Sequence, residues 1–169
     1  MNRPRRLAGL IALLLTLGTV SCGQKSVEEA GAPSPGCNLY DHLTEKIASL
    51  SLNELGGPYP SLGDSATYIT YLYYADGKKM GTVYGKANVP AKLPNGDLLE
   101  YSEERIQLDG GTIDSQGLYN ITKGFAGEWQ YLPAIGSGGA FMDKLGRRSF
   151  HIIKVGESLD ASIEVCPAG

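Results

Sequence analysis

The sequence has few of the residues that usually carry metal or nucleophilic chemistry. Its 169 residues include two histidines, three cysteines and one tryptophan. His42 and His151 lie far apart in the chain, no cysteines have metal-ligand spacing, and no Gly-x-Ser-x-Gly elbow occurs. We therefore expect no metal site and no nucleophilic triad.

The chain also lacks a basic excess and a long apolar run. Its formal net charge is −3, which makes nucleic acid an unsuitable partner. Residues 7–22 carry no charge, but this run falls short of the roughly 20 apolar residues of a membrane-spanning helix. Arg3, Arg5 and Arg6 precede it, so residues 1–21 have the layout of an export signal.

The end of this segment resembles a bacterial lipoprotein cleavage site, Gly18-Thr19-Val20-Ser21-Cys22. Lipidation of Cys22 would anchor the exported chain to a membrane. The alternatives are a retained anchor or a plain secretory signal, which would leave a periplasmic or extracellular protein. We expect residues 22–37 to form a flexible tether, because they are rich in small residues and proline.

With Cys22 assigned to lipid, Cys37 and Cys166 remain as an even pair. Disulfides persist in exported, oxidising compartments, so we expect a Cys37–Cys166 bridge. If the chain stays in the cytosol, two unpaired thiols are expected instead.

Residues 38–63 are predicted to form one short N-terminal helix and a loop. The helix rests on apolar residues at helical spacing, with Asn38 or Asp41 as its cap; these residues are Leu39, Tyr40, Leu43, Ile47 and Leu50. The following glycines and prolines indicate the loop.

Residues 64–169 change to a period of two, which is typical of strands. The first predicted strand, 67–74, is rich in β-branched and aromatic residues and precedes the hairpin signal Asp76-Gly77. Further strands are expected at 80–89, 97–108, 112–122, 128–135, 139–144, 149–155 and 161–166. We predict an all-β domain, an antiparallel closed barrel of about eight strands, with a two-sheet sandwich as the alternative. Ten tyrosines favour an apolar cavity that also offers hydroxyl groups.

Glycine-punctuated motifs run through this domain. They are Tyr73-Tyr74-Ala75-Asp76-Gly77, Met80-Gly81, residues 101–110, Ile113, Gln116-Gly117, Trp129, Pro133-Ala134, Gly136, Gly138-Gly139, Gly146-Arg147 and Phe150. The pattern resembles the allene-oxide-cyclase-like β-barrels, and among them the bacterial spirotetronate cyclases. The resemblance implies an intramolecular [4+2] cycloaddition, Diels-Alder or hetero-Diels-Alder, of a polyene polyketide of tetronate type, with no cofactor. Whether the barrel forms a homodimer stays open.

The resemblance also assigns two catalytic residues. Trp129 matches an inward tryptophan that would form a wall of the cavity, and Tyr131 shares its strand face. Tyr101 matches a tyrosine that would donate a hydrogen bond to a substrate carbonyl. The alternatives are core packing for Trp129 and an outward position for Tyr101.

Further substrate-binding candidates come from the predicted strands. Tyr71 and Tyr73 share one face of the first strand, whereas Tyr68 and Tyr74 share the other, and the sequence does not decide which points inward. The remaining lining candidates are Tyr119, Phe141, Met142 and Phe150, with core packing as their alternative role.

Most charged residues in the strands are interpreted as a solvated face, including Glu100, Glu103 and Asp114. Glu104 is the expected exception: inside the cavity, beside Gln116 or Arg105, burial would raise its pKa and let it act as an acid. Arg147 and Arg148 are interpreted as a solvated turn.

A second function fits the same barrel. The predicted export signal favours a non-catalytic, lipocalin-like lipoprotein that binds a hydrophobic small molecule. Both functions require a hollow barrel.

Overall fold

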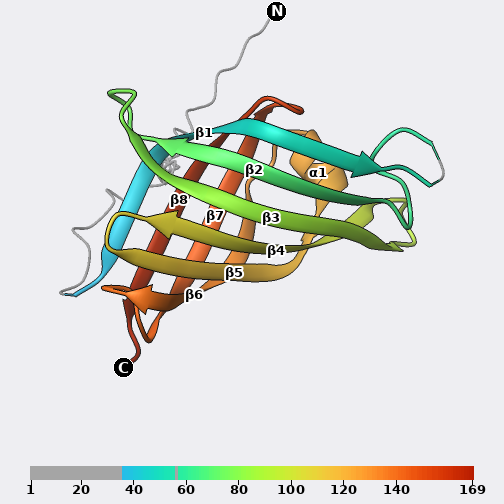
Figure 1. The fold of residues 1–169 in the computed structure, drawn as a ribbon. Coiled ribbons are helices and arrows are strands. Elements are labelled where there is room, and N and C mark those ends of the chain that lie inside the picture. Colours follow the sequence, from blue (N-terminus) through green and yellow to red (C-terminus); the bar gives the residue numbers. More distant parts are fainter. Residues whose placement is uncertain (1–35, 56) are drawn as a thin grey trace, which may run out of the picture. The chain divides into compact units, whose positions relative to one another are not determined.

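The computed structural model describes residues 36–55 and 57–169 (Figure 1). The predicted signal segment and Cys22 lie outside these residues, as does most of the predicted tether. Within the described part, no helix is long and apolar enough to cross a membrane.

Eight antiparallel strands form a closed barrel in chain order (Figure 1). They are β1 (Asn38–Asn53), β2 (Ser65–Tyr73), β3 (Lys79–Lys92), β4 (Leu98–Leu108), β5 (Gly111–Asn120), β6 (Gln130–Gly139), β7 (Lys144–Lys154) and β8 (Ser158–Pro167). Each strand pairs with its neighbours in sequence, and β1 pairs with β8 to close the ring. The predicted all-β barrel is confirmed, and the sandwich is excluded.

The predicted N-terminal helix is wrong, because this segment is the long strand β1. Its register shifts twice, between Tyr40 and Leu43 and between Ile47 and Ser49. Each β-bulge adds a residue, so the inward side chains Tyr40, Leu43, Ile47 and Leu50 acquire spacings of three and four. Two bulges in a strand thus imitate the period of a helix.

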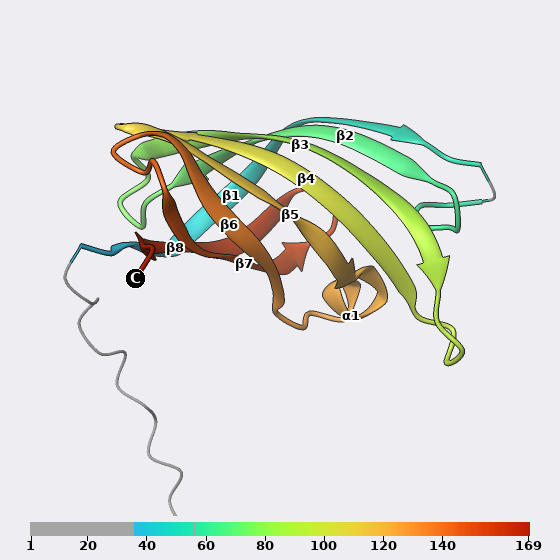
Figure 2. The same cartoon turned by 90° about the horizontal axis from the view of Figure 1, so that it is seen from below.

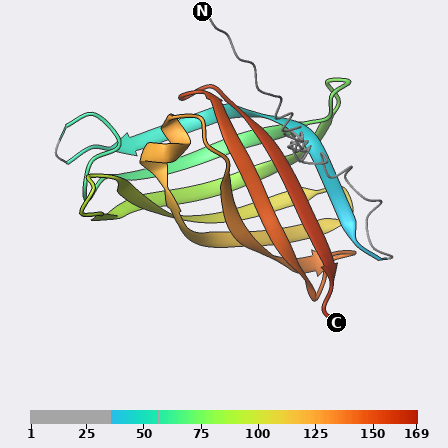
Figure 3. The same ribbon diagram turned by 180° about the vertical axis from the view of Figure 1, so that it is seen from behind.

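The single helix in the described residues is α1 (Ile121–Phe125), which follows β5. The Asn120 side chain caps it by accepting a hydrogen bond from the backbone N–H of Lys123. The helix packs against β4 and β7 at the end of the barrel where β5 finishes (Figures 2 and 3).

The predicted strand at 139–144 is also wrong. β6 ends at Gly139, and a tight turn leads into β7 at Lys144. The turn folds close against β6, since a Cβ on Gly136 would lie 1.6 Å from the Phe141 carbonyl oxygen. Asp143 adopts a positive φ of 63° within this turn. The glycines therefore permit a close approach of two backbones instead of marking a new strand.

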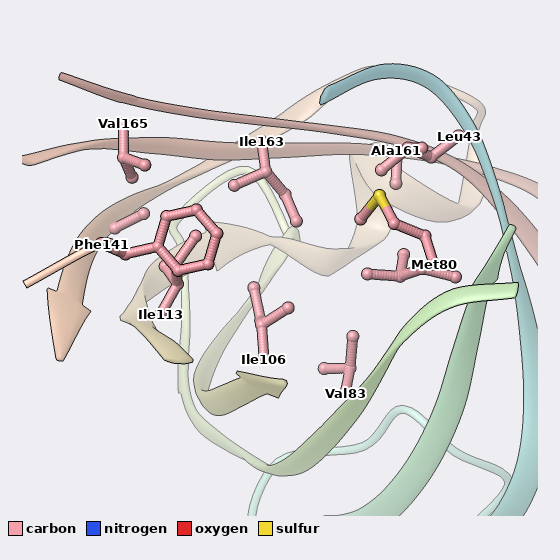
Figure 4. Close-up of a cluster of buried hydrophobic side chains, with 11 residues drawn as sticks. Leu43, Met80, Val83, Ile106, Ile113, Phe141, Ala161, Ile163 and Val165 are labelled. Carbon is pink, nitrogen blue, oxygen red and sulfur yellow. The ribbon is translucent and has the colours of Figure 1, made fainter. Parts of the chain in front are cut away.

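One half of the barrel interior is packed with apolar side chains (Figure 4). We call this cluster the apolar plug; its buried members are Leu43, Leu72, Met80, Val83, Ile106, Ile113, Ala134, Phe141, Ala161, Ile163 and Val165. The other half, toward α1, has a different lining. The inward side of β4 passes from Ile106 in the plug to Glu104, Ser102 and Glu100.

A disulfide joins Cys37 to Cys166, across 129 residues of sequence. It lies beside the paired residues Asn38 of β1 and Val165 of β8. The two strands that close the barrel are therefore also linked covalently.

Candidate binding cavity and its polar floor

A cavity of about 310 Å³ occupies the half of the barrel next to α1. Its rim is apolar and partly exposed, formed by Leu50 and Leu52 of β1, Phe125 of α1 and Val155 after β7. Phe150 and Ile152 of β7 line the wall. Apolar walls of this kind suit a largely hydrocarbon guest.

The floor of the cavity is a buried ionic group centred on Arg148 of β7, whose side chain is 1% exposed. Its Nη2 donates to Glu45 of β1 at 2.6 Å, and its Nε donates to Glu104 of β4. Thr70 Oγ1 donates to Glu45 at 2.6 Å, and the Tyr68 hydroxyl donates to Glu104 at 2.9 Å. We call these five residues the ionic floor; it lies between the apolar plug and the open half of the barrel.

The Arg148 guanidinium stays charged in this setting. Burial alone would lower the pKa of Arg148, but the carboxylates of Glu104 and Glu45 raise it above the ordinary arginine value. Its Nη1 is buried and has no hydrogen-bond partner among the described residues. The floor therefore holds one unpaired hydrogen-bond donor. A buried donor left unpaired costs roughly 1–3 kcal/mol.

A second polar group surrounds Glu100, nearer the rim. The hydroxyls of Tyr59 and Tyr119 donate to its two carboxyl oxygens, one to each. Burial raises the pKa of Glu100, and the two hydrogen bonds oppose this rise. The same site therefore offers two phenols and a carboxyl group that binds its proton more tightly than usual.

Tyr59 belongs to the loop between β1 and β2. The buried Asp64 organises the loop, because its carboxylate accepts backbone N–H bonds from Leu55 and Ser61, each at 2.7 Å. This arrangement brings Pro58 and Tyr59 to the lining of the cavity. The loop is therefore part of the site.

Three of the predicted site residues line the cavity. Glu104 forms part of the floor, and Tyr119 and Phe150 form the wall, with their rings edge to face at 5.1 Å. The partner of Glu104 is Arg148, whereas the predicted partners Gln116 and Arg105 lie on the outer face of the barrel.

The two residues assigned to catalysis do not reach the cavity. Trp129 is 43% exposed and stacks on His151, with ring centroids 5.5 Å apart. Tyr101 points outward between the inward residues Glu100 and Ser102 of β4. Both predictions placed the side chain inside the barrel, whereas Trp129 is exposed just before β6 and Tyr101 faces outward from β4. In a strand, a shift of one residue reverses the direction of every side chain.

The other predicted residues that miss the cavity point outward from their strands, belong to the apolar plug or lie in a turn. Tyr131 is 55% exposed on β6, where Gln130, Leu132 and Ala134 point inward. Tyr71 and Tyr73 face outward, each beneath a lysine ammonium group, whereas Tyr68 of the same strand faces inward. Phe141 belongs to the apolar plug, and Met142 is exposed in the turn before β7.

The sequence analysis does not find Arg148, Glu45 and Glu100, because it assigns charged residues to the surface, and it does not find Tyr59, because this residue lies in a loop. A signal was present in β4, since the apolar Ile106 shares its face with Glu100 and Glu104. The outward acids agree with the prediction: Glu103 pairs with Lys86 at 2.7 Å, and Asp114 pairs with Arg105 at 2.9 Å.

A larger hollow of about 650 Å³ lies over the outer face of β1 to β5, and its lining includes Lys86, Arg105 and Gln116. Its charged side chains already pair with each other on an exposed surface, so it offers little binding energy. Within residues 36–55 and 57–169, no cluster of three or more histidine, cysteine or acidic side chains is placed to hold a metal ion.

The fold and site define a closed eight-stranded barrel with a lumen that is half filled and half open. The domain description "Allene oxide cyclase barrel like domain" matches residues 43–165, and the chain belongs to this family. No curated protein matches the chain by sequence.

Several solved structures share the fold. AbnU, described as an exo-specific intermolecular Diels-Alderase, is 23% identical with a TM-score of 0.71; the match covers 76% of this chain and 96% of AbnU. The Diels-Alderase AbmU from Streptomyces koyangensis is 24% identical with a TM-score of 0.71, over 78% of this chain and 64% of AbmU. Pyocyanin demethylase is 21% identical with a TM-score of 0.60, over 76% of this chain and 97% of that protein. The barrel is therefore shared by proteins whose names describe different reactions.

Proposed function

We propose that this barrel is a cyclase that accelerates a [4+2] cycloaddition of a polyene polyketide bound in the cavity, without a cofactor. The observation that carries the proposal is a half-open barrel lumen with apolar walls, closed at its inner end by the ionic floor, where Arg148 Nη1 is the one buried side-chain donor without a partner among the described residues. The similarity to barrels described as Diels-Alderases supports the reaction class.

The proposed reaction needs geometry more than reactive groups. A concerted cycloaddition uses no nucleophile, and its barrier falls when diene and dienophile are held folded and close together. The wall residues Phe150 and Ile152 would compress the chain, while the Arg148 guanidinium would polarise a carbonyl conjugated with the dienophile.

The size of the cavity favours an intramolecular reaction. Its volume of about 310 Å³ is at the lower end of the range for ligand pockets, roughly 300–1,000 Å³. One folded chain fits this space better than two separate reactants. We therefore propose a single linear substrate, of the polyene tetronate type, in contrast to the intermolecular reaction described for AbnU.

The test is to incubate the purified barrel with a linear polyene tetronate and to separate the products by chiral chromatography. We expect faster formation of one ring isomer, identical in mass to the precursor. Tyr119→Phe should slow this reaction about tenfold, because it removes one of the two hydroxyls that hold Glu100 at the cavity wall. Trp129→Ala is the matched control on the outer face and should leave the rate unchanged.

Two outcomes would contradict the proposal. A rate equal to that in buffer would exclude a cyclase, and precursor recovered unchanged from a complex in native mass spectrometry would indicate a carrier. Equal losses in Tyr119→Phe and Trp129→Ala would show that the cavity is not where the reaction occurs.

We also propose that the chain is exported and anchored through lipid on Cys22. The Cys37–Cys166 disulfide supports an oxidising compartment. Labelling of expressing bacteria with a palmitate analogue should mark the wild type and leave Cys22→Ser unmarked; equal labelling of both would exclude this anchor.

A further inference from the structure

We infer that the ionic floor selects a guest whose inner end is a neutral carbonyl group and rejects one whose inner end is a carboxylate. This inference rests on the proposed function only in taking the cavity as the binding site. It goes further by specifying the charge of the group that reaches the floor and the direction in which a substrate enters.

The charges of the ionic floor do not balance. The single guanidinium of Arg148 faces two carboxylates, Glu45 and Glu104, and the side chains are 1%, 1% and 4% exposed. Thr70, Tyr68 and Ser102 add hydroxyl groups without charge. The floor therefore carries an excess of negative charge in a region shielded from water.

Apart from Arg148, Lys154 is the only cationic residue that lines the cavity in the described part of the chain, and it lies at the rim. Its side chain is 65% exposed, and it pairs with Glu157 at 2.7 Å. It does not compensate the floor. A carboxylate brought to the floor would meet two buried carboxylates whose cation is already shared, and repulsion is strong where the local dielectric is low.

A neutral carbonyl meets none of this repulsion. Arg148 Nη1 is a buried donor without a partner among the described residues. A guest carbonyl oxygen that accepts from it would satisfy the donor without adding charge, and hydrogen bonds to charged donors are stronger than those between neutral groups.

The same argument gives a direction to the proposed substrate. A chain with an acidic head group at one end and a neutral enone at the other would enter enone first. The enone carbonyl would lie at Arg148, and the acidic head would remain at the rim near the exposed Lys154.

Two probes with the same nonyl tail test the inference: methyl nonyl ketone and decanoate. Their dissociation constants are measured by isothermal titration calorimetry with the disulfide-bonded barrel at neutral pH, where decanoate is ionised. We expect the ketone to bind at least about tenfold more tightly, because the decanoate carboxylate at the floor would be repelled by the excess negative charge of Glu45 and Glu104. Equal or tighter binding of decanoate that persists in Lys154→Met would overturn the inference; decanoate binding that is lost in this variant shows the carboxylate held at the rim, as the inference requires.

Variants identify the cause of the preference. Glu104→Gln should reduce the preference for the ketone about tenfold, because it removes one negative charge while Arg148 remains. Glu103→Gln, one residue away on the outer face, is the matched control and should keep the wild-type preference. Glu45→Gln provides a second change with the same expected effect if Glu104→Gln does not fold. An unchanged preference in whichever of these two variants folds would also overturn the inference.

These measurements separate this inference from the proposed function, because they require no turnover. A barrel that prefers the ketone but does not cyclise a polyene would contradict the proposed function alone. A barrel that cyclises the polyene but binds both probes equally would contradict the inference alone.

Discussion

Replacing Arg148 by methionine should destabilise the barrel more than any other change of a single charge in the ionic floor. The substitution keeps an unbranched apolar side chain but leaves Glu45 and Glu104 buried without their shared cation. Removing one partner of a buried ion pair costs about 3–5 kcal/mol. With a urea m-value of roughly 2 kcal/mol/M, this loss lowers the unfolding midpoint by about 2 M.

The assay is urea unfolding of the oxidised protein, followed by circular dichroism at neutral pH. The informative comparison is the triple variant Arg148→Met, Glu45→Gln, Glu104→Gln, which removes the whole set of charges. It should recover most of the lost stability, because the penalty lies in the uncompensated carboxylates and not in the missing bonds. Arg105→Met removes an exposed arginine and should leave the midpoint unchanged. The reasoning is refuted if the single variant keeps the wild-type midpoint, or if the triple variant is no more stable than the single one.

Three further predictions concern other parts of the barrel. Gly85→Ala would place a Cβ 2.1 Å from the Tyr68 ring, so we expect a loss of about 1–3 kcal/mol in unfolding free energy and weaker binding of the ketone probe; an unchanged midpoint would contradict the packing. Because burial raises the pKa of Glu100, its contribution to stability is greatest below the ordinary glutamate pKa and is lost as the pH rises through the raised value. Urea midpoints of the wild type should therefore fall more between acid and neutral pH than those of Glu100→Gln; parallel pH dependences of the two midpoints would exclude a raised pKa of Glu100. Replacing Cys37 and Cys166 by serine should cost about 2–5 kcal/mol, measured as a lower thermal midpoint, and no change would mean that the bond does not stabilise the fold.

The sequence predicted the barrel well because most of its strands alternate regularly. β2 to β5 lie close to the predicted ranges, and the hairpin turns follow the Asp-Gly and Asn-Gly signals. β1 was mistaken for a helix because its two bulges change the spacing of its apolar residues. A bulge depends on pairing with strands distant in sequence, which a local pattern does not reveal.

The site was harder to predict than the fold, because both faces of several strands carry similar residues. In β6, the outward face holds Tyr131 and Ile135, with the exposed Trp129 just before the strand, and the inward face holds Gln130 and Leu132. Hydrophobicity therefore favoured the wrong face. The buried position of Arg148 depends on carboxylates from β1 and β4, and only the folded barrel brings these together.

The apolar plug makes the lumen a cup and not a tube. A guest that enters past the rim must leave by the same route, so the product has to turn or back out before another substrate can be accommodated. Escape, not ring closure, would then limit the speed of the proposed enzyme, and larger or stiffer products would remain bound longest.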